Sequence, residues 1–409
     1  MEVKGKRLRA MFDSYKRDPR IENPAEYLHD QVQESLDSGE IKPEDFSLRD
    51  LFTNLVPSGW EMLHDWDRSR RRGGHIVMEA VHAVDSATFA SITGQLVFSA
   101  VQDSMALDEG ISDQLVTVFP SQFQNAELVP GITAVSDEFA DEVAEGDPYP
   151  IIGLAAEDIT LPRAEKHGGI LPITREAIIA DRTGVLIERA QTVGRAAGLR
   201  KEKDILRVVI GGVNPYIRKG EARNTYASTG MGFDNDGTPN LVNYTDIQEQ
   251  DELFHAIREP NTNEPLGFRP TTIVCSPQLA WTARHVVRDT QVRLGLIDTA
   301  PGIQSIGANR IPYNLDILSN EFLVDAIMDT AANGGLAVAA RADANLYWWL
   351  GNPRAAFVWK EIWGLTTEEA PVNNEAQFSQ DVWFRVKVSY KGCPGVREPR
   401  VMVRSDGTA

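Results

Sequence analysis

The chain has 409 residues, of which 42% are hydrophobic and 24% charged, so it can bury a sizeable core and fold as more than one domain. No apolar run approaches the roughly 20 residues of a membrane span, and we expect a soluble protein with no membrane partner. The net charge of −18 argues against a general nucleic-acid binder, and the two cysteines, Cys275 and Cys393, define no disulfide framework.

Residues 1–72 differ in composition from the rest of the chain. Met1 to Ile21 carries seven basic and three acidic residues, whereas Glu22 to Asp50 carries nine acidic and two basic residues. Leu48 to Trp66 is too apolar for a disordered tail. We therefore predict a helical arm that docks on another surface, such as a neighbouring subunit.

A basic junction, RSRRRGG, follows at Arg68 to Gly74. It is either a solvated, flexible connection, or a processing site or a contact with DNA. Beyond it, apolar spacing predicts a helix near 86–105, and Ser112 to Pro120 reads as a strand. The segment SDEFADEVAEGD, within Val129 to Pro150, holds six acids and no base. Such a cluster is either a cation site or a solvated loop face, and its spacing matches no calcium loop.

The central stretch, Asp158 to Gly212, predicts an extended hairpin that leads into a long helix. Alternating residues from Asp158 to Leu161 favour one strand, and a second apolar run follows Gly168-Gly169, which could supply a tight turn. Arg182 to Gly212 has helical spacing and ends at a glycine pair. Gly194 and Gly198 lie one turn apart inside this pattern, so either the helix is weak there or another element packs closely.

The second half of the chain alternates strand and helix patterns, which predicts an α/β or α+β domain. We expect a turn, and not a calcium loop, at Asp234 to Gly237. The aromatic stretch Asn345 to Trp363 is either a stacking platform or strands packed on a core. The other predicted elements are helices at Asp246 to Ile257 and Pro277 to Val292 and strands at Thr271 to Cys275, Asn314 to Leu318 and Leu336 to Ala340.

The end of the chain gives a clear strand pattern. Apolar residues alternate with polar ones between Phe378 and Tyr390, which predicts a strand with one face on the core. Gly392 to Gly395 is predicted to turn the chain, and Val396 to Val403 to return as a second strand.

An extended hairpin feeding a long, glycine-interrupted helix resembles the extended loop and spine helix of tailed-bacteriophage major capsid proteins, the Hong Kong 97-type fold. The resemblance covers roughly residues 75–405 and rests on the order and character of segments. It implies an α+β fold in which a peripheral domain holds the spine helix and long antiparallel strands, beside an axial α/β domain. The implied segments are an N-terminal arm at 1–72, the N-arm and start of the peripheral domain at 73–127, the extended loop at 128–175, the spine at 176–240, the axial domain at 241–375 and closing strands at 376–409.

The resemblance also implies a function. It predicts a structural protein of the virion capsid, assembled in the host cytoplasm into an icosahedral shell around phage DNA. Its implied partners are itself, as pentamers and hexamers, the packaged double-stranded DNA without sequence specificity, portal, scaffold or decoration proteins, and a maturation protease. The alternatives are an encapsulin-like shell that holds cargo, an unfamiliar α/β enzyme, and a tail or adaptor protein.

Motifs for catalysis, phosphate binding and zinc binding do not occur in the sequence, and we expect no catalytic residue, no metal site and no cofactor. Some capsids of the resembled family form lysine–asparagine isopeptide bonds between subunits. Lys166 on the extended loop, Asn373 or Asn374, and the carboxylate of Glu375 have the residue types that this reaction needs.

Overall fold

The computed structural model describes thirteen ranges of the chain and five single residues. They are residues 82–105, 110–130, 158–174, 183–212, 216–218, 220–227, 233–258, 267–288, 291–295, 304–308, 314–323, 345–369 and 382–408, with Glu34, Glu145, Asn263, Pro265 and Ile311. The chain forms two compact units. Unit 1 comprises residues 1–107, 166–199 and 363–391, and unit 2 comprises residues 108–165, 200–362 and 392–409.

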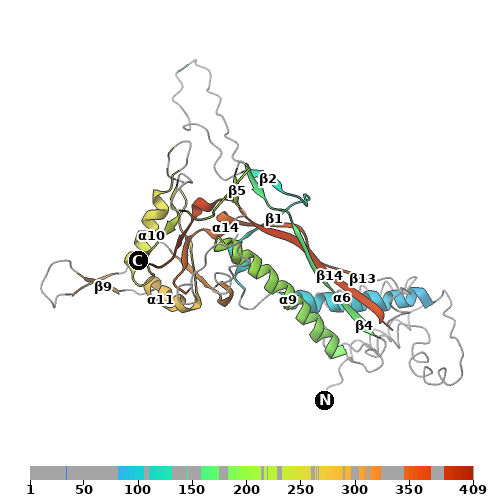
Figure 1. The fold of residues 1–409 in the computed structure, drawn as a ribbon. Helices are drawn as coiled ribbons and strands as arrows, with labels where there is room; N and C mark the ends of the chain where they lie inside the picture. The colour runs from blue at the N-terminus through green and yellow to red at the C-terminus, as the bar shows by residue number, and fades with distance from the viewer. Residues whose placement is uncertain are drawn as a thin grey trace. The chain divides into compact units, whose positions relative to one another are not determined.

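Two long helices, shown in Figure 1, dominate the first half of the described chain: α6, His82–Met105, and α9, Thr183–Val209. Both were predicted from the spacing of their apolar residues. Helix α9 ends where Gly211 adopts a φ of 75°. The Gly211 and Gly212 amides donate to the carbonyls of Val208 and Arg207 at 3.0 and 2.9 Å. This paired capping satisfies carbonyls of the last turn, which explains why the glycine pair stops the helix.

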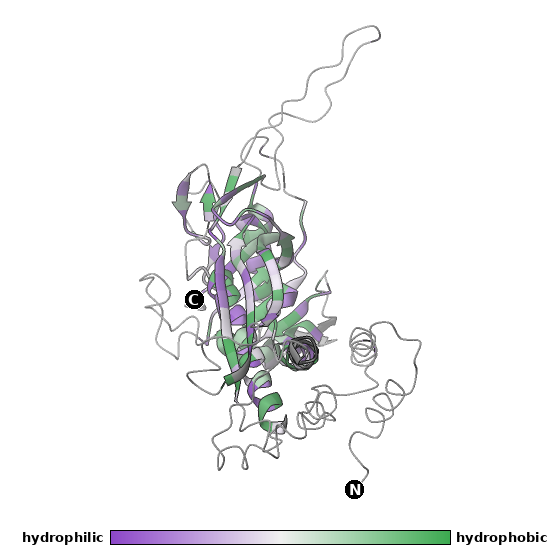
Figure 2. Cartoon of the chain, turned by 90° about the vertical axis from the view of Figure 1, so that its right-hand side faces the viewer, coloured by the Kyte–Doolittle hydropathy of each residue, from purple (hydrophilic) through white to green (hydrophobic). Residues whose placement is uncertain are grey.

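A four-stranded sheet has the strand order β1-β13-β14-β4. Its members are β1 (Thr117–Pro120), β13 (Phe357–Glu369), β14 (Val382–Val396) and β4 (Glu165–Thr174). Along β14, Val386, Val388 and Tyr390 are buried. Hydrophobic and hydrophilic segments both occur along the long strands in Figure 2, as expected for a sheet with one face on a core.

A second four-stranded sheet, in the order β2-β3-β5-β6, belongs to unit 2. It contains β2 (Glu127–Pro130), β3 (Asp158–Leu161), β5 (Tyr216–Arg218) and β6 (Glu221–Arg223). Strands β2 and β3 pair antiparallel, as do β3 with β5 and β5 with β6.

The core of unit 2 is a five-stranded sheet in the order β11-β8-β12-β15-β7, with helices α10 and α11 packed against it. Buried residues from both helices and from strands β8 and β12 form one apolar cluster, with Trp348 fully buried. The elements are β11 (Asp316–Ser319), β8 (Thr272–Cys275), β12 (Trp348–Gly351), β15 (Met402–Ser405), β7 (Asp236–Gly237), α10 (Tyr244–Ala256) and α11 (Pro277–Arg288). The predicted α+β class is confirmed.

Five short elements complete the described structure. A two-stranded antiparallel ribbon is formed by β9 (Gln291–Gly295) and β10 (Gln304–Ala308). The helical turns α7 (Ser112–Leu115) and α14 (Pro353–Ala356) and the 3-10 turn η2 (Pro399–Val401) lie at the ends of strands.

The predicted tight turn at Gly168-Gly169 is wrong, because both glycines lie inside the continuous strand β4. The hairpin is instead β2 with β3, while β4 belongs to a different sheet. A Cβ on Gly168 would lie 2.5 Å from the carbonyl oxygen of Val388 on β14. The glycine is therefore required by the close approach of a neighbouring strand.

The predicted turn at Gly392 to Gly395 is wrong for the same reason. Strand β14 runs through it to Val396, and the chain reverses later, so that β15 joins the five-stranded sheet. A Cβ on Gly392 would lie 2.6 Å from the ring of Trp359. The predicted closing hairpin therefore becomes two strands in different sheets.

Two smaller corrections concern element boundaries. The first half of the predicted strand Ser112 to Pro120 is the helical turn α7. The predicted helix Pro277 to Val292 ends at Arg288, and Val292 lies in β9. The predictions for the basic junction and for the strand Leu336 to Ala340 fall outside the described residues, as do those for the arm and the acidic segment apart from single positions.

Candidate functional site

The segment 131–157 is inserted between two paired strands. Strand β2 ends at Pro130, β3 begins at Asp158, and these two residues are direct partners in the antiparallel register. Both ends of the insertion are therefore held side by side by the sheet. This segment contains the acidic stretch noted in the sequence.

A buried lysine secures the base of this insertion. The Lys360 side chain on β13 is fully buried, and its Nζ donates to the Asn125 carbonyl at 2.8 Å and lies 3.1 Å from Oε2 of Glu127. Ser121 Oγ donates to the same Glu127 oxygen at 2.5 Å. The loop before β2 is thus fixed to β13 by hydrogen bonds and an ion pair. Sequence reasoning missed Lys360, because a lysine in an alternating strand normally faces solvent.

In unit 1, a cationic and aromatic group lies on the sheet. The ammonium groups of Lys166 and Lys391 lie 5.6 and 5.1 Å from the ring centroid of Trp363, within cation–π range. Lys387 forms an ion pair with Glu368. The hydrogen bond and charge of Lys387 hold the pKa of Glu368 below its ordinary value.

Lys166 is the residue for which the resemblance implied crosslinking. It is exposed and lies at the start of β4. Asn373, Asn374 and Glu375 lie outside the described residues. The structure therefore places one member of the set and does not bring the set together.

Close helix packing explains one of the two glycines in the predicted spine. A Cβ on Gly194 of α9 would collide with the Ser104 hydroxyl and the Val101 carbonyl of α6. Of the two alternatives left open by the sequence, close packing by another element is confirmed at Gly194.

A buried carboxylate organises the start of α7 in unit 2. Glu202 on α9 is 1% exposed and accepts the backbone amides of Ile111 and Ser112 at 2.9 and 3.0 Å. It also accepts from Asn320 Nδ2 at 2.9 Å. Three donors on one carboxylate compensate for its burial. No sequence signal distinguishes Glu202 from the charged residues around it.

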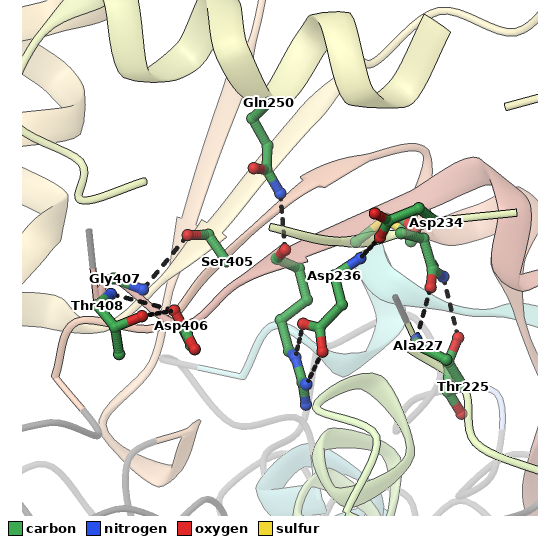
Figure 3. A network of polar contacts seen from close by, with 12 residues as sticks. Thr225, Ala227, Asp234, Asp236, Gln250, Ser405, Asp406, Gly407 and Thr408 are labelled. Atoms are coloured by element: carbon green, nitrogen blue, oxygen red, sulfur yellow. Dashed lines mark hydrogen bonds and ion pairs between the residues drawn. The ribbon is translucent and has the colours of Figure 1, made fainter. Parts of the chain in front are cut away.

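The sequence predicted only a turn at Asp234 to Gly237, and this prediction is wrong for its second half. Asp236 and Gly237 form β7, parallel to β15. Figure 3 shows the contacts: Arg404 donates from Nε and Nη2 to the two carboxylate oxygens of Asp236, at 2.7 and 2.6 Å. Gln250 of α10 donates to the Arg404 carbonyl at 2.8 Å. Asp236 therefore joins β7 to β15.

A second carboxylate–arginine pair in unit 2 is almost fully enclosed. Arg400 donates from Nε and Nη2 to the two oxygens of Glu398 at 2.6 Å each. Both side chains are 1% exposed. Burial raises the pKa of the neighbouring Tyr216 to about 12, an effect to which the Glu398 charge adds.

The described residues offer little for chemistry. No group of three or more histidine, cysteine or acidic side chains among them could hold a metal ion. One cavity is lined by Phe254, Ile257, Phe268 and Arg400 among others, and also by His255, whose Nδ1 lies 2.9 Å from the carbonyl oxygen of Asp251. Trp348 and Trp349 are fully buried, so the strand-packing interpretation of that aromatic stretch is confirmed. None of the described helices is long and apolar enough to cross a bilayer.

One comparison with known proteins identifies a family for this chain. A family model described as phage capsid protein matches residues 157–405, which is more than half of the chain. No curated protein matches the sequence significantly. Among solved structures, the capsid of the cyanophage P-SCSP1u is similar with a TM-score of 0.45 and 14% identity over 72% of this chain and 87% of that chain.

Two further solved structures have the same character. The cyanophage Pam1 capsid gives a TM-score of 0.45 and 10% identity over 74% of this chain and 93% of that chain. A virus-like particle from Pyrococcus furiosus gives a TM-score of 0.40 and 9% identity over 76% of this chain and 97% of that chain. These structural likenesses are low and add no weight to the family match, which rests on the sequence model.

Proposed function

We propose, from the premise that this chain belongs to the phage capsid protein family, that its copies close into pentamers and hexamers of an icosahedral shell around phage DNA. The protein is a structural major capsid protein that self-assembles into a shell and resides in the virion capsid. The observation that carries the proposal is the family match, which runs from β3 to β15.

The surface of the single chain supports extensive self-association. Several large apolar side chains are solvent-exposed, including Phe123 at 67% and Leu128 at 66% near the base of the 131–157 insertion. Scattered apolar residues are normal on a surface, but exposed aromatic and aliphatic side chains next to the ends of the 131–157 insertion suit a subunit contact. Many modest contacts of this kind act together in a closed assembly.

The charge and the segment order support the rest of the proposal. A net charge of −18 suits a wall that contains DNA without binding it tightly. We assign residues 1–72 to an arm, 128–175 to an extended loop that crosses a neighbouring copy, and 241–375 to the axial domain. A maturation protease acts at the Arg68 to Gly74 junction in this scheme, and portal, scaffold or decoration proteins complete the particle.

Negative-stain microscopy of the purified chain, with mass spectrometry of the assembled subunit, tests the proposal. We expect the purified chain to form closed shells or rings with five- and six-fold symmetry. Shells isolated from infected cells should contain nucleic acid. A subunit mass that is lower by the mass of residues 1–72 would show that the arm is removed. A uniform monomer under conditions that favour assembly would contradict the proposal, and a shell filled with a cargo protein would favour an encapsulin-like role.

A further inference from the structure

Helices α10 and α11 cover opposite halves of the five-stranded sheet. Helix α11 packs on β8 and β11, whereas α10 packs on β12 and β15, toward the other edge. Both contribute to one apolar cluster, Ile247 from α10 and Ala280 and Ala283 from α11, so they lie on the same face. Figure 1 shows the two helices apart from each other in this part of the chain.

The outer side of α11 is basic and aromatic. Ala280 and Ala283 are buried, and the exposed stripe contains Trp281, Arg284 and Arg288, spaced as one helix face. Trp281 is 70% exposed. The sequence of α11 contains no acidic residue. Tryptophan and arginine are the residue types that most often dominate binding energy at protein interfaces.

The outer side of α10 has the opposite charge. Its exposed stripe contains Thr245, Glu249 and Glu252, and Val242, which is 61% exposed, lies just before the helix on the same spacing. The buried side contains Ile247 and Phe254. Each helix therefore presents one exposed apolar residue beside two like charges, and the charges of the two helices are complementary.

We propose that the α11 face of one copy docks on the α10 face of the next copy. This inference rests on the proposed shell function and names the contact between neighbouring axial domains. The partner is a second copy because the same chain carries both complementary faces. The two faces are different surfaces of the same chain, so the contact is heterologous, and such a contact closes into rings when the rotation permits. Trp281 is the apolar anchor, and the arginines face Glu249 and Glu252.

Charge reversal in the full-length chain tests the contact. Arg284→Glu/Arg288→Glu gives a copy whose two faces are both acidic, and Glu249→Lys/Glu252→Lys gives a copy whose two faces are both basic. Each variant alone should raise the protein concentration needed for assembly, measured by sedimentation velocity, by about tenfold or more. Trp281→Ala should act in the same direction, and Arg284→Lys/Arg288→Lys, which keeps the charge, should assemble like the wild type.

Two rescue experiments separate a specific contact from general damage. The four reversals combined in one chain restore complementary faces and should restore rings and shells. An equal mixture of the two double variants should also assemble, but only with alternating copies, so it should form six-membered rings and no five-membered rings.

The outcomes also separate this inference from the proposed function. Failure of the wild-type chain to form rings or shells would overturn the shell function. If the wild-type chain assembles and the two double variants assemble equally well, only the α10–α11 contact is overturned. The same holds if the double variants lose assembly and the combined variant does not restore it. Intact shells that lose an accessory virion protein would overturn it in favour of that protein as the occupant of the α11 face.

Discussion

Units 1 and 2 differ in their buried charges: among the described residues, the buried charged side chains all lie in unit 2, and they are Glu202, Lys360, Glu398 and Arg400. In unit 1, α9 approaches α6 closely at Gly194, and β4 approaches β14 closely at Gly168. In unit 2, buried or half-buried charges such as Glu202, Glu398 and Asp236 connect segments that are distant in the chain or satisfy short turns. Close glycine contacts occur in both units, since a Cβ on Gly392 of unit 2 would also meet the Trp359 ring. The contrast therefore lies in the charges: substitutions that remove a buried charge should be most damaging in unit 2.

The largest expected effect is at the enclosed pair of unit 2. Glu398→Gln leaves the Arg400 charge buried without its carboxylate, and the free energy of unfolding should fall by about 3–5 kcal/mol. Urea denaturation of the unassembled subunit measures this loss. The matched control is Glu221→Gln, whose ion pair with Arg223 spans the same sequence distance but is largely exposed, and should cost less than about 1 kcal/mol. Equal losses in the two variants would contradict the contrast.

The next effect is at the helix contact of unit 1. Gly194→Ala places a methyl group against the Val101 carbonyl and the Ser104 hydroxyl, and should cost about 1–3 kcal/mol despite the better helix propensity of alanine. Gly184→Ala in the same helix is the control, because no atom lies within 4 Å of its added Cβ. It should be neutral or stabilise by up to about 1 kcal/mol. Thermal unfolding would refute close packing if both substitutions stabilised the protein.

A smaller effect is expected at the half-exposed pair drawn in Figure 3. The side chains of Asp236 and Arg404 are 25% and 24% exposed, so solvent screens their interaction. Asp236→Asn should therefore lower the free energy of unfolding by only about 1 kcal/mol, and the loss should shrink in high salt. A loss as large as that of Glu398→Gln, independent of salt, would show that burial does not rank these pairs.

The smallest effect concerns the two thiols of unit 2, which affect reactivity more than stability. Burial raises the pKa of Cys275 to about 12 and that of Cys393 to about 11. A raised pKa keeps the unreactive thiol form at neutral pH, so folded subunits should react with iodoacetamide at least about a hundredfold more slowly than unfolded ones. Mass spectrometry after timed alkylation measures this, and rapid labelling of Cys275 in the folded state would contradict its burial.

Periodicity predicted the elements whose burial depends on one local pattern. The spine helix, α10 and β8 lie within a few residues of their predicted bounds, because an amphipathic stripe or a short apolar run has few alternatives. The family resemblance rested on the order of such elements and is confirmed by the family match. The sequence contained no motif from which a site residue could be predicted. The residues around Lys360 and Glu202 show no pattern that would have predicted the contacts of these two side chains.

The sequence by itself determined the long spine helix with its glycine stop. It left the fold class between α/β and α+β, and the aromatic stretch between a stacking platform and strands packed on a core. The tertiary structure decided what the other glycines do. A glycine in a strand pattern permits either a turn or the close approach of a neighbour, and only the neighbour distinguishes the two. At Gly168 and Gly392 that neighbour is the Val388 carbonyl and the Trp359 ring. Pairing in space likewise decided that β14 and β15 belong to different sheets.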